Sequence, residues 1–139
     1  MAPLLALLLA ELATPAHAAA VEVEVDGIEP GGGPVRVALC RDGLTDAACD
    51  RGEEAQAAGG TARLVFREVA PGTYAVAAYQ DGNDNGRLDR TPLGLPTEPY
   101  GFSGEAGRRA RPDFARAAFA VREPGTGVRV RLARALPRR

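Results

Sequence analysis

The chain has 139 residues, of which 45% are hydrophobic and 25% are charged, and its formal net charge is −1. This length suits one globular domain, while the near-neutral charge and the 5% aromatic content argue against a nucleic-acid-binding surface. All 17 basic residues are arginines, which excludes the chemistry of a catalytic lysine, and the single histidine is His17.

Residues 1–20 predict a secretory signal peptide. Residues 4–9 form an apolar run that is too short to cross a bilayer, and a small-x-small cleavage sequence ends at Ala18. We expect cleavage after Ala18 or Ala20. Because no arginine precedes the apolar run, a short N-terminal helix that belongs to the domain is the alternative.

Export would place the mature chain in the periplasm or outside the cell. We expect a domain over residues 21–135 and a frayed tail over 136–139, with no second apolar stretch that could form a transmembrane segment. Cleavage also removes His17, the single histidine. The mature chain therefore cannot carry a Ser-His-Asp or Cys-His catalytic site or a histidine-bound zinc ion.

Short stretches that alternate apolar and polar residues recur along the mature chain, as is typical of half-buried strands. Glycine- and proline-rich turns separate them, and the best helical stretch is only 113–118. We therefore predict an all-β fold, an antiparallel Ig-like or transthyretin-like sandwich of about seven strands. The expected strands are 21–25, 35–39, 53–57, 62–66, 73–79, 117–121 and 128–132.

A Pro71-Gly72 turn precedes the strand that begins at Thr73. Pro71 presets φ, and Gly72 is free to take the positive φ that a type II turn requires. This Pro-Gly-x-Tyr hairpin resembles those of transthyretin-like and carboxypeptidase-regulatory-like sandwiches. The resemblance implies a fold and no chemistry.

Charge is distributed unevenly. Residues 21–107 contain seven arginines and fifteen acidic residues, whereas residues 108–139 contain ten arginines and two acidic residues. We expect acidic and basic strands to face each other or to lie at opposite edges of one sheet. The alternative is a basic face for an anionic partner.

The only two cysteines, Cys40 and Cys49, flank a turn-like segment. In an oxidising compartment an even number of cysteines favours a disulfide, so we predict that these two are bonded. The alternative is a reactive or metal-binding thiol pair, but the spacing is not C-x-x-C and no histidine is available.

The most specific feature is the acidic segment 81–89, Asp-Gly-Asn-Asp-Asn-Gly-Arg-Leu-Asp. Its alternating Asp and Asn residues followed by glycine match the opening of a calcium loop. Such a loop points oxygen atoms at one centre, and calcium takes six to eight of them at about 2.3–2.6 Å. The predicted ligands are Asp81, Asn83, Asn85, the carbonyl of Arg87 and Asp89.

This segment departs from an EF-hand in two ways. Position twelve is Pro92 instead of the bidentate glutamate, and the flanking sequence does not predict paired helices. We therefore expect weak binding, with a dissociation constant on the order of 10⁻⁴–10⁻³ M. The alternative is a turn without metal, closed by hydrogen bonds from side chains to the backbone.

A long glycine- and proline-rich stretch follows at residues 94–107. Long irregular loops often carry function, so this one is a candidate for a small-ligand or peptide site. The candidate residues are Glu98, Tyr100, Phe102 and Ser103. The alternative is that the two rings cap the open end of the sandwich.

Several segments together resemble one bacterial family. They are the opening Val-x-Val strand, 35–39, 69–76, the acidic segment 81–89, the Gly-x-Pro-x-Glu-x-Tyr-Gly-Phe-Ser sequence within 93–103, and 114–121. The chain resembles the exported family numbered 2141 among domains of unknown function. This resemblance implies a small exported domain and no activity. The cysteine pair is an addition to the pattern, and Pro99 stands where glycine is usual.

These features favour a non-enzymatic exported binding or structural module without catalytic residues. Its partner would be a protein, a peptide or an envelope glycan, with weakly bound calcium as the only expected cofactor. The alternative is a hydrolase of an envelope glycan or peptide, since two carboxylates about 5–9.5 Å apart can cleave glycosides. The candidate carboxylates are Asp81, Asp84, Asp89 and Glu98.

Overall fold

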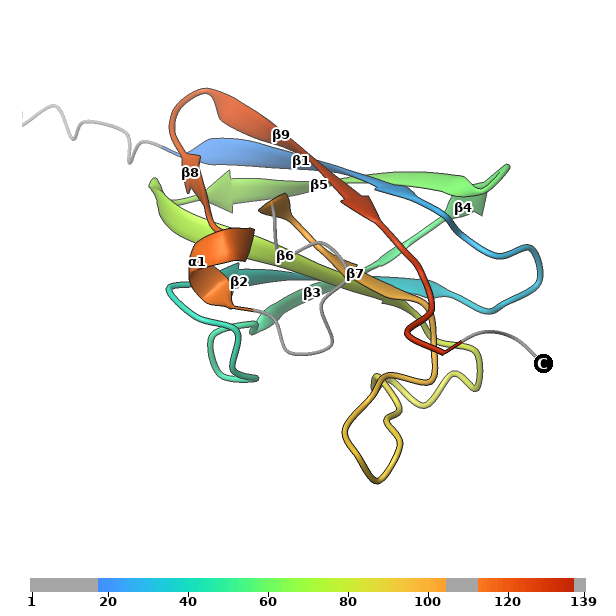
Figure 1. The fold of residues 1–139 in the computed structure, drawn as a ribbon. Helices are drawn as coiled ribbons and strands as arrows, with labels where there is room; N and C mark the ends of the chain where they lie inside the picture. The colour runs from blue at the N-terminus through green and yellow to red at the C-terminus, as the bar shows by residue number, and fades with distance from the viewer. Residues whose placement is uncertain (1–17, 105–112, 137–139) are drawn as a thin grey trace, which may run out of the picture.

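The computed structural model describes residues 18–104 and 113–136, which form a sandwich of two β-sheets (Figure 1). The first sheet has the order β4-β5-β1-β9, and the second has the order β3-β2-β6-β7, with β8 also paired to β6. The elements are β1 (Ala19–Asp26), β2 (Val35–Arg41), β3 (Arg51–Ala55), β4 (Ala57–Ala58), β5 (Thr61–Val69), β6 (Gly72–Gln80), β7 (Tyr100–Phe102), α1 (Phe114–Ala117), β8 (Phe119–Val121) and β9 (Gly125–Arg131).

The core lies between the two sheets and is built by strands whose side chains alternate. In β1, Val21, Val23 and Val25 are at most 1% exposed, and they pack with Val35 and Val37 of β2 in one cluster. A shift of one residue in the register of β1 would turn all its buried valines outward, so this alternation fixes the strand pairing. The predicted antiparallel β-sandwich is therefore confirmed.

One strand pair has an orientation that the alternation did not reveal. β9 runs parallel to β1, with Ala20 opposite Gly125 and Asp26 opposite Arg131. A parallel pair needs a long crossover, and here the chain between β1 and β9 passes through the second sheet.

Among the described residues, no helix is long and apolar enough to cross a membrane.

The chain after β7 also differs in detail from the prediction. The strand expected at 117–121 begins only at Phe119, because α1 precedes it and the Asp113 side chain caps that helix by accepting a hydrogen bond from the Ala115 amide at 3.0 Å. β7 itself forms within the stretch that was expected to be irregular. The strand expected at 128–132 is present as β9, which begins earlier, at Gly125, and ends at Arg131.

The Pro71-Gly72 turn does not have the predicted geometry. Gly72 is not among the residues with positive φ; it already pairs with Val121 as the first residue of β6. The positive φ falls instead on Glu68, at 54°. The turn is closed by the Tyr74 hydroxyl, which donates to the carbonyl of Ala70 at 2.6 Å.

Acidic and basic side chains face each other across the outer surface of the first sheet, as predicted. Glu24 of β1 binds Arg63 of β5 at 2.9 Å and Arg129 of β9 at 3.2 Å. Arg129 also lies 3.5 Å from Asp26. The acidic strand thus lies between two strands that carry arginine, one of which, β9, comes from the arginine-rich end of the chain.

The predicted disulfide joins Cys40 and Cys49, with an S–S distance of 2.04 Å. Cys40 is fully buried on the outer face of the second sheet, where it packs with Ala75 and with Ala117 of α1. The disulfide therefore fastens the loop between β2 and β3 onto a small second core.

Replacing both cysteines by serine (Cys40→Ser, Cys49→Ser) is expected to lower the free energy of unfolding by about 2–3 kcal/mol, because the unfolded chain loses a covalent loop closure. Urea denaturation of the oxidised wild type and the double variant measures the difference. Reduced wild type should lose a similar amount. Equal stability of oxidised wild type, reduced wild type and variant would contradict the expectation.

Candidate functional site

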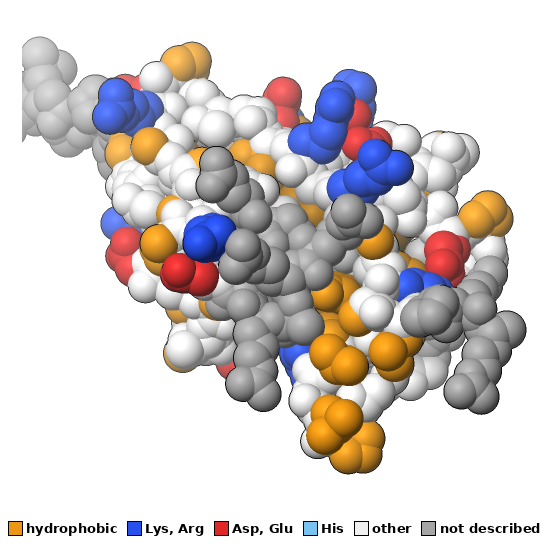
Figure 2. Space-filling model, in the orientation of Figure 1, with side chains coloured by type: hydrophobic (Ala, Val, Ile, Leu, Met, Phe, Trp, Pro, Cys, Tyr) orange, Lys and Arg blue, Asp and Glu red, His pale blue; other side chains and the backbone are white. Residues whose placement is uncertain are grey.

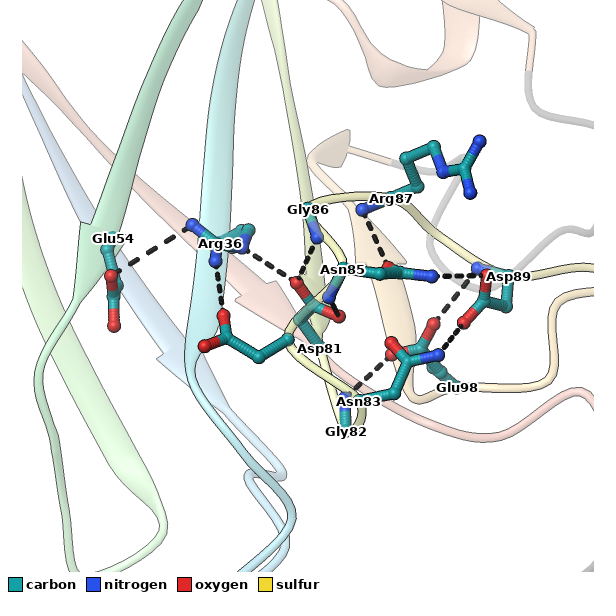
Figure 3. A network of polar contacts seen from close by, with 11 residues as sticks. Arg36, Glu54, Asp81, Gly82, Asn83, Asn85, Gly86, Arg87, Asp89 and Glu98 are labelled. Atoms are coloured by element: carbon teal, nitrogen blue, oxygen red, sulfur yellow. Dashed lines mark hydrogen bonds and ion pairs between the residues drawn. The ribbon is translucent and has the colours of Figure 1, made fainter.

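Polar side chains from several segments meet where β6 ends (Figure 3). At their centre is Asp81, the residue after β6, which is 0% exposed. Its Oδ1 accepts a hydrogen bond from the Asn85 amide at 3.1 Å, and its Oδ2 accepts one from the Gly86 amide at 2.7 Å. Gly86 has φ +75°, a conformation that glycine adopts without strain, so the chain can fold its amides back onto the carboxylate.

Arg36 of β2 supplies the charge opposite Asp81. Its Nε donates to Asp81 Oδ2 at 2.8 Å, and its Nη2 donates to Asp84 Oδ1 at 2.6 Å. Burial raises the pKa of Asp81, but the hydrogen bonds from Arg36, Gly86 and Asn85 outweigh burial and hold that pKa below its ordinary value. The buried carboxylate is therefore ionised at neutral pH.

Asp89 is held by the two asparagine side chains of the loop. The Asn85 and Asn83 amides donate to its two oxygens, at 2.8 Å and 2.6 Å. These hydrogen bonds lower the pKa of Asp89. The Asn85 Oδ1 in turn accepts the Arg87 amide at 3.0 Å, whereas the Arg87 guanidinium points away from the network (Figure 3).

Glu98 closes the loop from its far end. Its Oε2 accepts the Gly82 amide at 2.7 Å, and its Oε1 accepts the Asp89 amide at 2.9 Å. Glu98 is 8% exposed, and burial raises its pKa, although the two amides act in the opposite direction. One carboxylate thus joins the start and the end of the acidic segment.

Two further contacts anchor this network to the sandwich. Gln80, which is 1% exposed, accepts the Glu29 amide at 2.9 Å and donates to the carbonyls of Glu29 and Gly33 at 2.8 and 3.1 Å. Arg134 forms a two-point pair with the Glu29 carboxylate, both distances being 2.7 Å, and donates to the Thr97 carbonyl at 3.1 Å. We call these contacts, with those of Asp81, Arg36, Asp89 and Glu98, the polar frame.

A groove of about 580 Å³ lies on the outer face of the second sheet, and residues 86–88 of the acidic segment, with Arg90, line one side of it. The loop between β2 and β3, which the disulfide closes, lines the other side. This loop and the one between β6 and β7 both lie below the second sheet in Figure 1. The apolar lining of the groove comes from Leu44, Cys49, Ala77, Leu88, Tyr100 and Phe102, and its charged lining residues are Asp46, Arg87 and Arg90.

Hydrophobic side chains also gather at this end of the molecule, over the segment that joins β6 to β7 (Figure 2). Leu93 is 82% exposed at the tip of a short hairpin. The hairpin is closed by two hydrogen bonds, both at 2.8 Å: the Thr91 amide donates to the Leu95 carbonyl, and the Gly94 amide donates to the Thr91 carbonyl. The groove thus lies beside a rigid apolar projection.

The four candidates of the long loop are mostly buried. Tyr100 is 2% exposed and lies edge-on to Phe102, with ring centroids 6.1 Å apart; both rings also line the groove. Ser103 is fully buried, and its hydroxyl accepts the Val76 amide at 2.8 Å and donates to the Ala117 carbonyl at 2.7 Å. Glu98 and Ser103 therefore hold the loop in place, and only the two rings reach a cavity.

The structure brings together the side chains of the acidic segment that the motif singled out, but the motif missed their main partner. Arg36 lies 45 residues from Asp81 in sequence, and Arg134 lies 105 residues from Glu29. No local spacing connects such residues. Only the pairing of β2 with β6, which sets Arg36 opposite Tyr79, could have placed Arg36 beside the loop.

The donor atoms of the acidic segment are mostly occupied by partners within the protein. Among the residues that the structure describes, no group of three or more His, Cys, Asp or Glu side chains is placed to hold a metal ion. Both oxygens of Asp81 already accept hydrogen bonds, one of them from a cation. The frame therefore neutralises its central carboxylate with an arginine.

The comparisons with known proteins agree with the resemblance noted from the sequence. The profile of a family described as "Uncharacterized protein conserved in bacteria (DUF2141)" matches residues 23–129, which include most of the sandwich and the whole acidic segment. No curated protein and no solved structure matches the chain. Since the family profile covers well over half of its length, the chain belongs to the DUF2141 family.

Proposed function

We propose that this protein is a non-enzymatic module of the bacterial cell envelope, exported to the periplasm or beyond, that binds a partner in the groove on the outer face of the second sheet. The partner would be a protein, a peptide or an envelope glycan. One observation carries the proposal: both oxygens of Asp81, Asp89 and Glu98 accept hydrogen bonds from the frame itself. These carboxylates hold the loop whose residues 86–88 line the groove.

The same observation argues against the hydrolase alternative. A glycosidase needs one carboxyl group that protonates the leaving group and a second that acts as nucleophile or base. Asp81 is inaccessible at 0% exposure, and Glu98 is 8% exposed. Asp84 is exposed, but its Oδ1 is paired with Arg36.

The groove has the properties of a binding site. Its volume falls within the range of about 300–1,000 Å³ that is common for ligand pockets, and its lining combines apolar side chains with three charged ones. One side is fixed by the polar frame and the other by the disulfide. Because both sides are already fastened, binding would order few groups and lose little entropy.

Site-specific photo-crosslinking in a bacterial envelope tests the proposal. A photoreactive benzoylphenylalanine is placed at Asp46, an exposed residue of the groove, and as a matched control at Arg63, on the outer face of the other sheet. We expect a discrete adduct from position 46, lost when Leu88→Glu is added, and none from position 63. Equal labelling from both positions, or none from either, would contradict the groove as the binding face.

The enzymatic alternative has its own readout. Purified protein is incubated with peptidoglycan and with a mixed peptide substrate, and soluble products are measured by mass spectrometry. We expect no turnover. Turnover that is abolished by Asp89→Asn, in a variant that remains folded by circular dichroism, would replace the binding module with a carboxylate-dependent hydrolase.

Weak calcium binding is the second candidate for the acidic segment, and one observation favours it. Asn83 and Asn85 both converge on Asp89, at 2.6 and 2.8 Å. Oxygen and nitrogen of an asparagine amide exchange places on a half-turn, so the same side chains could present oxygens to a cation. Asp81 and the carbonyl of Arg87 would complete the predicted set.

Calcium titration separates the two candidates. The polar frame predicts the same melting temperature in EDTA and in millimolar calcium, and no binding heat. A rise in melting temperature with calcium that disappears in the double variant Asp81→Ala, Asp89→Ala would establish the calcium site instead.

A further inference from the structure

The residue at which β1 begins distinguishes between the two signal-peptide cleavage positions predicted from the sequence, after Ala18 and after Ala20. β1 begins at Ala19, two residues before the expected start of the domain at residue 21. Ala19 is 2% exposed and belongs to the main core cluster. It also lies opposite Val69 at the end of β5. Ala19 is thus part of the folded sandwich.

Ala20 is equally part of the sheet. Its amide donates to the carbonyl of Pro124 at 3.1 Å, and it is the first residue of β1 to pair with β9, opposite Gly125. The two backbones approach so closely that a Cβ added to Gly125 would lie 2.4 Å from the Ala20 carbonyl oxygen. A chain that began at Val21 would lose all these contacts.

Ala18, in contrast, belongs to no strand and is exposed. A small-x-small sequence ends at this residue, and small residues at these positions are what signal peptidases require. A cut after Ala18 would therefore remove no residue of β1.

We infer that the exported chain is cut by a signal peptidase between Ala18 and Ala19, so that the mature protein begins with the first residue of β1. Water adds across the Ala18–Ala19 peptide bond, the released peptide keeps the carboxylate of Ala18, and Ala19 receives the new α-ammonium group. This inference rests on the export that the proposed function includes.

Intact mass spectrometry of the processed protein tests the inference directly. The full chain is produced in a Gram-negative bacterium, and the periplasmic and cytoplasmic fractions are analysed separately. We expect a periplasmic chain that begins at Ala19. A periplasmic chain that begins at Val21 would overturn the cleavage position and leave export intact, whereas an uncut cytoplasmic chain would overturn export as well.

Two matched substitutions support the assignment. Ala18→Gln places a large residue immediately before the inferred cut and should prevent cleavage there. Ala20→Gln makes the same change at a residue of β1 that is only half-buried, and should leave processing at Ala19 unchanged. Cleavage that is blocked by Ala20→Gln would contradict the inference, because only a cut after Ala20 requires a small residue at that position.

Stability provides a readout that does not depend on processing. Chains that begin at Ala19 and at Val21 are prepared by removal of a cleavable tag and melted under the same conditions. The chain from Val21 should melt about 4 °C or more below the other, because it lacks a buried methyl group and the hydrogen bond to Pro124. Equal melting temperatures would show that residues 19 and 20 contribute nothing to the fold.

Discussion

Replacing Asp81 by asparagine (Asp81→Asn) is expected to lower the free energy of unfolding by about 2–3 kcal/mol, because hydrogen bonds to a charged group are strong and a buried donor left without its acceptor is costly. Asp81 is 0% exposed and accepts hydrogen bonds from Arg36, Asn85 and Gly86. An asparagine has the same shape but turns an NH₂ group toward one set of these donors, so at least one donor loses its acceptor. Urea denaturation at neutral pH measures the loss.

Asp84→Asn is the matched control. Asp84 also pairs with Arg36, at 2.6 Å, but its side chain is 70% exposed. Exposed ion pairs contribute little to stability, so this variant should unfold almost as wild type does. Comparable losses in the two variants would mean that Asp81 is no more important than a surface charge.

The loss caused by Asp81→Asn should also depend on pH in a defined direction. Because the pKa of Asp81 is lowered from its ordinary value of 3.8 in the folded protein, its ionised form contributes stability that is fully present above that value. This contribution disappears as the pH falls through the folded-state pKa. The difference between wild type and variant should therefore be constant near neutral pH and shrink below about pH 3.8. A difference that stays constant down to pH 2 would contradict the assignment.

Replacing Gln80 by leucine (Gln80→Leu) is expected to cost about 3 kcal/mol, from roughly 1 kcal/mol for each of three buried hydrogen bonds. Leucine keeps most of the volume but leaves the amide of Glu29 and the carbonyls of Glu29 and Gly33 without the partner they have in the wild type. Among the described residues, every buried side-chain nitrogen or oxygen has a hydrogen-bond partner, so the change would break a fully satisfied network. Thermal and urea unfolding measure the cost.

Thr126→Val is a matched control for Gln80→Leu, since it also replaces a polar side chain that binds a backbone carbonyl with an apolar one. The Thr126 hydroxyl donates to the Ala120 carbonyl at 3.3 Å in an exposed position. Water can replace this single bond, so the effect should be well below that of Gln80→Leu. Similar effects would show that the contacts of Gln80 do not anchor the frame.

The strands of this fold could be predicted because alternation depends only on neighbouring residues. Val21, Val23 and Val25 alternate with acidic residues, and burial of one face follows from that pattern alone. The sequence did not predict β7, because Gly101 and the prolines around it are atypical of strands. A Cβ added at Gly101 would lie 2.3 Å from the carbonyl oxygen of Arg131, so glycine is needed there for close packing against β9.

The candidate site was predictable only as far as its residues are close in sequence. The motif correctly grouped Asp81 with Asn85 and Asp89, because a tight turn brings such neighbours together. It could not supply Arg36, which reaches Asp81 only through the pairing of β2 with β6. Without that arginine, oxygen-rich side chains in a glycine turn suggest a cation, since nothing local neutralises them. The arginine changes the expected counter-charge from a metal to a side chain.

Amide hydrogen exchange measured by NMR tests most directly whether the polar frame holds the acidic segment without a metal. The amides of Gly82, Asn85, Gly86 and Asp89 donate to buried carboxylates. We predict that in EDTA these four amides exchange far more slowly than in an unstructured peptide, and that millimolar calcium does not change their rates. Exchange at unstructured rates in EDTA, with protection only after calcium is added, would contradict the account.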